Sequence, residues 1–229
     1  MNTTTARILQ VSVGLPQTYV ASDPRDQRPA EWRTAIDKSA VEGPVQLTTA
    51  GLEGDGCADR QNHGGIEGAV LLYAAGHYLQ WRIELPEHDW QFGGFGENLT
   101  IDGLTEETVC IGDCWRRGTV LLEVSKPRQP CWKLCRRWQQ PDLAKRVIQT
   151  GRGGWYARVL ERGDVSAGDE MTLEDRPHPR WTVARVPTVL RPRTRLRCSK
   201  GAGSCATAVA ELAGRAAEPP SVIPLQHGI

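Results

Sequence analysis

Residues 8–13 read ILQVSV, in which apolar and polar side chains alternate with the period of two that is typical of a half-buried strand. The same alternation returns in residues 44–49, 118–125, 155–160 and 170–174. The segments between these stretches are rich in Gly, Pro and Asp, which favours many tight turns. The sequence therefore predicts a mainly β fold whose strands close into a barrel-like sheet.

Three stretches have the composition of helices, namely residues 74–84, 131–138 and 141–150. The last of them begins with Pro141, which suits the first position of a helix, and Gly151 follows its end. We therefore expect a few helices to accompany the predicted barrel.

The composition of the chain changes after Asp175, because the next six residues, RPHPRW, contain two prolines. The pattern predicts one domain over residues 1–175 and a partly irregular appendage over 176–229, with a linker near 176–180. A short Ala-rich helix is expected at residues 206–217. Because the strand pattern is complete before residue 176, we expect the barrel to fold without the appendage.

Charge is segregated along the 229 residues, although the formal net charge is only +1. Residues 1–175 carry 19 basic and 25 acidic side chains, whereas 176–229 carry nine basic and two acidic ones. Solvated charge without a pattern explains such a tail better than nucleic-acid binding does, so no nucleic-acid partner is expected.

The hydrophobic and charged fractions, 39% and 24%, fit a globular protein and exclude a disordered or fibrous chain. No apolar stretch approaches the roughly 20 residues that a membrane-spanning helix needs. The polar start MNTTTAR also lacks the apolar block of a signal peptide. A cytoplasmic protein without a membrane partner is therefore expected.

The segment KPRQPCWKLC, residues 126–135, offers the strongest chemical signal. Its two prolines restrict the backbone and predict that Cys131 stands at the start of a helix, where unpaired amides favour a thiolate. Arg128 and Lys133 add positive charge. A fixed thiolate suits nucleophilic attack, sulfur transfer or ligation of a soft metal, while a buried structural cysteine is the alternative.

The cysteines also allow a structural zinc site, because Cys110 and Cys114 are followed after sixteen residues by Cys131 and Cys135. Three residues separate the members of each pair, whereas a zinc knuckle usually has two. A binding module with zinc on these four thiols is therefore an alternative interpretation.

Two glycine-rich segments could cradle an anion or a heterocycle. The first, residues 51–73, supplies Asp55, Arg60 and His63, and the second, FGGFGENLTIDGL at 92–104, supplies Glu97 and Asn98. The amide of Asn98 can donate and accept at the edge of a pterin or purine. Because Gly and Asp are also what turns require, an ordinary connector is the alternative.

Six ordered motifs together resemble MOSC-domain proteins of the YiiM-like group. They are GLEGD, HGG with AVLLY, FGENLTIDGL, IGD, PRQPCWKL and GWYARVLERGDVSAGDEM. The resemblance covers residues 9–173 and implies a β-barrel-like fold with a few helices. WTVAR at 181–185 matches the start of the group's small helical C-terminal region, and the chain then departs from it.

The resemblance implies an enzyme that uses a molybdenum cofactor, molybdopterin, to reduce N-hydroxylated compounds such as hydroxylaminopurines. Cys131 would ligate molybdenum, and a flavin or iron–sulfur reductase would supply electrons. Cofactor contacts are expected from the charged and polar members of the motifs, Asp55, Arg60, His63, Glu97, Asn98, Arg128 and Lys133. A sulfur carrier or sulfurtransferase with a persulfide on Cys131 is the alternative, since MOSC domains also occur in sulfur-handling proteins.

Overall fold

The computed structural model of the chain describes residues 4–21, 26–59 and 64–186. The predicted site residues Arg60 and His63 and the expected helix at 206–217 lie outside these ranges.

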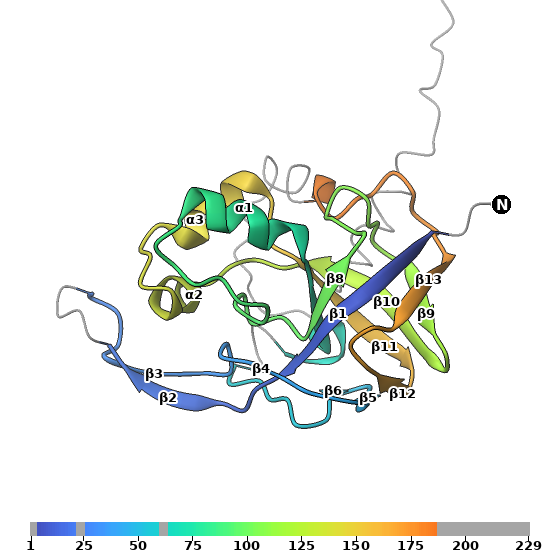
Figure 1. Cartoon of the computed structure of the whole chain (residues 1–229), viewed down its shortest axis with the longest axis horizontal. Helices are drawn as coiled ribbons and strands as arrows, with labels where there is room; N and C mark the ends of the chain where they lie inside the picture. Colours follow the sequence, from blue (N-terminus) through green and yellow to red (C-terminus); the bar gives the residue numbers. More distant parts are fainter. Residues whose placement is uncertain (1–3, 22–25, 60–63, 187–229) are drawn as a thin grey trace, which may run out of the picture.

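Seven strands close into a barrel (Figure 1). In their order around the barrel they are β13 (Glu170–Asp175), β9 (Cys114–Arg117), β10 (Val120–Pro127), β11 (Trp155–Glu161), β7 (Val70–Ala74), β8 (Leu99–Asp102) and β1 (Thr5–Val13). β1 then pairs with β13 and completes the circle. Neighbouring strands run antiparallel except β7 and β8, which are parallel. The predicted β-barrel-like fold is confirmed.

In the described ranges, six further strands of two to four residues lie outside this circle. β4 (Ser39–Ala40) extends the sheet beside β1, and β12 (Gly163–Val165), β5 (Val45–Thr48) and β6 (Gly51–Leu52) form a three-stranded sheet. β2 (Gln17–Val20) and β3 (Glu31–Thr34) form a hairpin. The three α-helices gather on the same side of the barrel as this hairpin (Figure 1).

The helices are shorter than the sequence predicted. Ala74 belongs to β7, so α1 covers Gly76–Glu84. α2 covers Trp132–Arg137, and α3 covers Leu143–Thr150 with Asp142 as its N-cap, so Pro141 is not the first helical residue. Gly151 ends α3 in the left-handed region, with φ of 74°, as its position after the helix predicted. One 3-10 helix, η1 (Ile66–Gly68), was not predicted.

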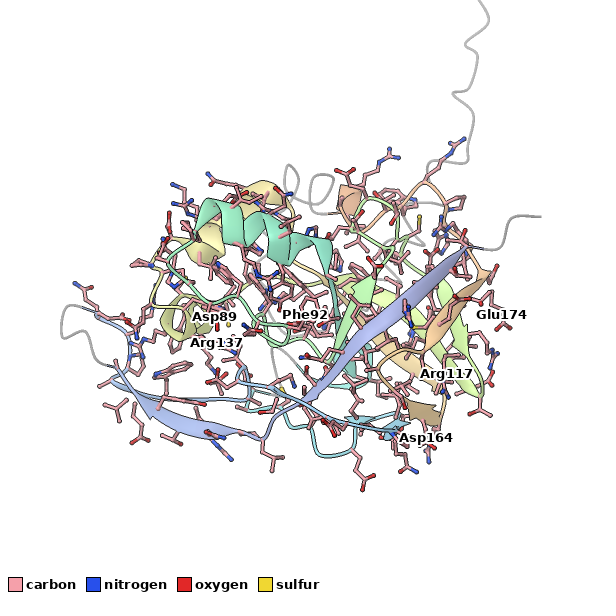
Figure 2. The ribbon with its side chains drawn as sticks, viewed as in Figure 1. Asp89, Phe92, Arg117, Arg137, Asp164 and Glu174 are labelled. Atoms are coloured by element: carbon pink, nitrogen blue, oxygen red, sulfur yellow. The ribbon has the colours of Figure 1, made fainter. Side chains whose placement is uncertain are left out.

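Two apolar cores lie on either side of strand β7. Leu72 belongs to the core inside the barrel, whereas Tyr73 faces a second, aromatic core under the helices. This alternation is what a strand with one face toward each core requires. Figure 2 places Phe92 and Arg137 on the helical side and Arg117, Asp164 and Glu174 at the far end of the barrel.

Residues 176–186 pack against the barrel. Val183 and Val186 are buried in the barrel core, and Thr182 forms an isolated β-bridge with Cys110. The guanidinium of Arg176 donates to the buried carboxylate of Asp113. The domain boundary at residue 175 stays a prediction, but these contacts tie the first eleven residues beyond it to the barrel. Among the described residues, no helix is long and apolar enough to cross a membrane.

Candidate functional site

A cavity of about 440 Å³ opens between the barrel, the β2–β3 hairpin and the start of α2. Five of the predicted site residues line it, namely Asp55, Asn98, Arg128, Cys131 and Lys133. Their positions span 79 residues of sequence, so the fold brings together the motifs that the sequence could only place in order.

Cys131 is the N-cap residue of α2, with extended backbone angles of φ −108° and ψ 167°. Its side chain makes no capping hydrogen bond, and its carbonyl accepts from the amide of Leu134. The thiol therefore does not cap the helix, and Cys131 lines the cavity. The prediction that Cys131 stands at a helix start is confirmed.

Arg128 reaches the cavity from the loop between β10 and α2. Its backbone amide donates to the carbonyl of Gly154 (3.0 Å), and its Nη2 donates to the carbonyl of Phe95 (3.1 Å). The residue is 7% exposed, and Nη1 has no hydrogen-bond partner within the described part of the chain. A buried guanidinium nitrogen without a partner is costly, which suits a site that receives an anionic group.

Asp55 and Asn98 form a polar network on one wall of the cavity. Asn98 Nδ2 donates to Asp55 Oδ2 (2.8 Å), while Asn98 Oδ1 accepts from the amide of Leu71 (3.0 Å). Asp55 Oδ1 accepts from the amide of Gly14 (2.8 Å) and from the ammonium of Lys38. The protein satisfies both side chains, so this wall is fixed before any ligand binds.

Glu97 does not line the cavity, contrary to the expected cofactor contact. It is fully buried and accepts from the Tyr78 hydroxyl (2.6 Å), the Thr100 hydroxyl (2.9 Å) and the amides of Gly93 (2.7 Å) and Phe95 (3.1 Å). These bonds hold the turn whose Phe95 carbonyl receives Arg128. Glu97 is therefore a positioning residue for Arg128.

Lys133 lies on α2 just beyond Cys131 and lines the cavity. Its ammonium donates to the carbonyl of Arg33 (2.7 Å), which ties the helix to the hairpin. The positive charge predicted beside Cys131 is thus present at the cavity from both Lys133 and Arg128.

The lining residues that were not predicted include Lys38, Cys57 and Tyr156. Burial raises the pKa of Tyr156, Arg128 opposes this effect, and Cys131 and Cys57 add to it. Both thiols therefore lie close enough to influence the same phenol. Cys57 directly follows the GLEGDG motif, which is the one sequence signal that could have indicated it.

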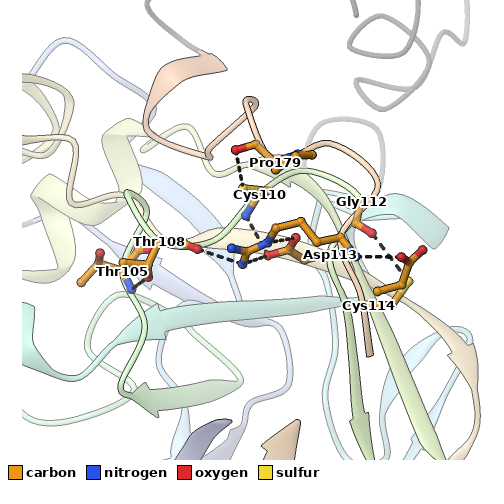
Figure 3. A network of polar contacts seen from close by, with 9 residues as sticks. Thr105, Thr108, Cys110, Gly112, Asp113, Cys114 and Pro179 are labelled. Atoms are coloured by element: carbon orange, nitrogen blue, oxygen red, sulfur yellow. Dashed lines mark hydrogen bonds and ion pairs between the residues drawn. The ribbon is translucent and has the colours of Figure 1, made fainter. Parts of the chain in front are cut away.

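The alternative of a zinc site on four cysteines is wrong. The described residues contain no group of three or more His, Cys, Asp or Glu side chains placed to hold a metal ion. The thiols of Cys110 and Cys114 donate instead to the carbonyls of Pro179 and Gly112, both at 3.6 Å (Figure 3). Burial is the first cause that raises the pKa of both thiols, and acidic neighbours add to it.

Comparison with known proteins identifies the family that this chain resembles. The family model of the MOSC domain matches residues 59–172. A protein named "Reductase" from Gibberella moniliformis is 46% identical over 166 residues, which are 71% of this chain and 29% of that protein. The chain therefore corresponds to less than a third of that relative.

Two shorter relatives match over most of their length. Uncharacterized protein YflK of Bacillus subtilis is 43% identical over 169 residues, which cover 74% of this chain and 73% of YflK. The crystal structure of YiiM from Geobacillus stearothermophilus is 34% identical with a TM-score of 0.64, over 80% of this chain and 83% of that one. The chain therefore belongs to the MOSC-domain family, in its YiiM-like group.

Proposed function

We propose that this protein is a molybdenum-cofactor-dependent reductase of N-hydroxylated compounds, including hydroxylaminopurines, and that Cys131 ligates the metal. Membership of the MOSC-domain family and the relative named "Reductase" support the reductase class. We also propose that the protein is cytoplasmic and that it receives electrons from a flavin or iron–sulfur partner.

One observation carries the proposal, namely a thiol and a buried, partly unpartnered guanidinium on the same cavity. Molybdenum prefers soft sulfur ligands, which Cys131 offers. The phosphate of a pterin cofactor is anionic, which suits Arg128 Nη1 because this buried donor has no partner among the described residues. The chemistry of the two side chains therefore fits the group.

The other cavity residues would bind and orient. Lys133 adds a second cation beside Cys131, and Asn98 and Asp55 present a wall that their own hydrogen bonds already hold in place. Because Glu97 fixes the Phe95 carbonyl that Arg128 contacts, the guanidinium is also held in place. A site fixed in this way spends little binding energy on ordering its side chains.

The cofactor, when bound, supplies reversible two-electron transfer. Conversion of an N–OH group to N–H consumes two electrons and two protons, breaks the N–O bond and releases water. Glu97 is buried away from the cavity, and its carboxylate accepts hydrogen bonds from four protein groups. It can therefore support the site only through the Gly93–Phe95 turn.

The test uses protein purified from a host that makes the pterin cofactor, with a chemical electron donor in place of the reductase. We expect reduction of an N-hydroxylated purine by loaded protein and none by cofactor-free protein. Equal turnover without molybdenum would exclude the proposal. If labelled sulfur from a cysteine desulfurase were held on Cys131 in metal-free protein, the sulfur-carrier alternative would replace it.

A further inference from the structure

Positive charge is concentrated around Cys131 in an otherwise acidic domain. Residues 124–141 contain five basic side chains and no acidic one, while residues 1–175 as a whole carry more acidic than basic side chains. Two of the five, Arg128 and Lys133, line the cavity. The other two cations of α2, Arg136 and Arg137, form ion pairs with Asp26 and Asp37.

α2 binds the β2–β3 hairpin along its length. Arg136 Nε donates to Asp26 (2.8 Å) and its Nη1 to the carbonyl of Pro29 (2.7 Å). The rings of Trp32 and Trp132 lie 5.8 Å apart, with the Arg136 guanidinium 4.8 Å from the Trp132 ring centroid. Hairpin and helix therefore form one continuous surface at the edge of the cavity, because the residues that follow β3 also line it.

The outer part of this surface consists of Arg28, Arg33, Trp132 and Lys133, which we call the hairpin–α2 rim. Arg33 is exposed, and its side chain makes no hydrogen bond or ion pair with the described residues. The Lys133 ammonium contacts the backbone carbonyl of Arg33 and not its side chain. The Arg28 side chain is 44% exposed, with its guanidinium 5.7 Å from the half-buried Trp132 ring.

We propose that the hairpin–α2 rim is the docking surface for an acidic electron-transfer protein. This inference rests on the proposed function, which requires an electron donor at this cavity. Arg and Trp are the residues that most often dominate binding energy at protein interfaces. Exposed cations beside the cavity would attract an acidic partner and direct it toward Cys131.

A protein fits this rim better than a nucleic acid does. Acidic side chains are interspersed with the cations, since Asp26 pairs with Arg136, Asp37 pairs with Arg137 and Glu31 lies on β3. A polyphosphate backbone requires an extended, uniformly basic track. A patch of mixed sign with an aromatic centre is instead typical of recognition between folded proteins.

Arg33→Glu tests the docking surface, because the Lys133 bond to the backbone of residue 33 does not depend on this side chain. With an acidic flavodoxin as donor at low ionic strength, we expect the KM for flavodoxin to rise about tenfold. Turnover with a chemical donor should not change. Arg33→Lys should restore the KM, and high salt should remove the difference between wild type and variant.

The matched control is Arg162→Glu, an exposed charge reversal in the turn before β12, which lies at the opposite end of the molecule from α2 (Figure 1). It should leave the KM for flavodoxin unchanged. Equal KM values for wild type, Arg33→Glu and Arg162→Glu would overturn the docking surface. No turnover by wild type with the chemical donor would instead contradict the proposed function.

Binding provides a readout without activity. Titration calorimetry of full-length, cofactor-free protein with flavodoxin at low salt should give a weaker affinity for Arg33→Glu than for Arg162→Glu. A duplex DNA probe should bind neither protein measurably at physiological salt. Binding of that DNA with loss in Arg33→Glu would overturn the acidic-protein assignment in favour of nucleic acid.

Discussion

Nδ2 of Asn98 lies 2.8 Å from Oδ2 of Asp55 and joins two glycine-rich motifs that are 43 residues apart in the sequence. Asn98 stands at the entry to β8, and Asp55 follows β6, so the bond ties the cavity wall to the barrel. The same amide also contacts the Ser12 carbonyl and the Leu71 amide. One side chain thus serves both the barrel and the candidate site.

Asn98→Ala should destabilise the protein because it removes the acceptor of the buried Leu71 amide and the Asn98 donor to Asp55 Oδ2. We expect the free energy of unfolding to fall by about 2–4 kcal/mol, measured by urea denaturation. Gln46→Ala, at an exposed position on β5, is the control and should change it by less than about 0.5 kcal/mol. Equal midpoints and slopes for the two variants would contradict this account of Asn98.

The Cys114 thiol should titrate far above a free cysteine. Burial, which is the largest cause, and the charges of Glu123, Asp175, Glu174 and Asp113 together raise its pKa to about 11. At pH 8 only about a thousandth of this thiol is then ionised, so iodoacetamide should label it slowly, at a rate that increases with pH up to about 11. Peptide mass spectrometry of the labelled protein measures the rate at each pH.

Glu123→Gln tests whether a neighbouring negative charge contributes to the raised pKa of Cys114. Removal of one negative charge favours the thiolate, so the pKa of Cys114 should fall and its labelling at any given pH below 11 should become faster. Urea-unfolded protein, in which burial and neighbours are lost, sets the upper limit. A native labelling midpoint below pH 9 would show that burial does not control this thiol.

Much of the barrel was predictable because alternation along a strand reports locally on which face is buried. The closure of β1 against β13 was not, since pairing between residues such as Ala6 and Met171 depends on chain ends that are distant in sequence. The parallel pair β7–β8 was hidden for the same reason. The start of α1 was misplaced because Ala74 continues a buried strand despite its helical propensity.

The candidate site also contains residues that the sequence could predict and residues that it could not. Cys131 and Arg128 lie in one short motif whose prolines and cations could be read directly. Lys38 has no such signal, because only the fold brings it to the carboxylate of Asp55. Glu97 was predicted to contact the cofactor because a motif shows residue type but not side-chain direction. In the structure its carboxylate accepts hydrogen bonds from four protein groups.

Cys131→Ser should abolish retention of molybdenum without loss of stability, because the thiol makes no capping bond and serine is a good N-cap residue. The measurement is the molybdenum content of protein purified from a cofactor-producing host, with thermal unfolding in parallel. Cys135→Ala is the matched control from the same helix, since its sulfur only accepts from the Ala144 amide at 3.4 Å. Full metal content in Cys131→Ser would remove this residue as the ligand.

Arg176 should be required for the stability of the barrel although it lies beyond the strands. Asp113 is fully buried and accepts two hydrogen bonds from the Arg176 guanidinium, at 2.8 and 2.6 Å. Arg176→Met would leave this carboxylate without its cation. We expect the free energy of unfolding to fall by about 2–4 kcal/mol, whereas the exposed control Arg180→Met should have little effect.

Truncation extends the test from one ion pair to the whole segment of residues 176–186. A chain that ends at Asp175 loses Arg176 and also exposes the surface that Val183 and Val186 cover in the barrel core. It should therefore unfold at a lower temperature than Arg176→Met, because burial of each valine adds about 1.5–3 kcal/mol. A chain that ends at Val186 keeps all of these contacts. Calorimetry that gave both truncated chains the same unfolding temperature would show that this segment does not stabilise the barrel.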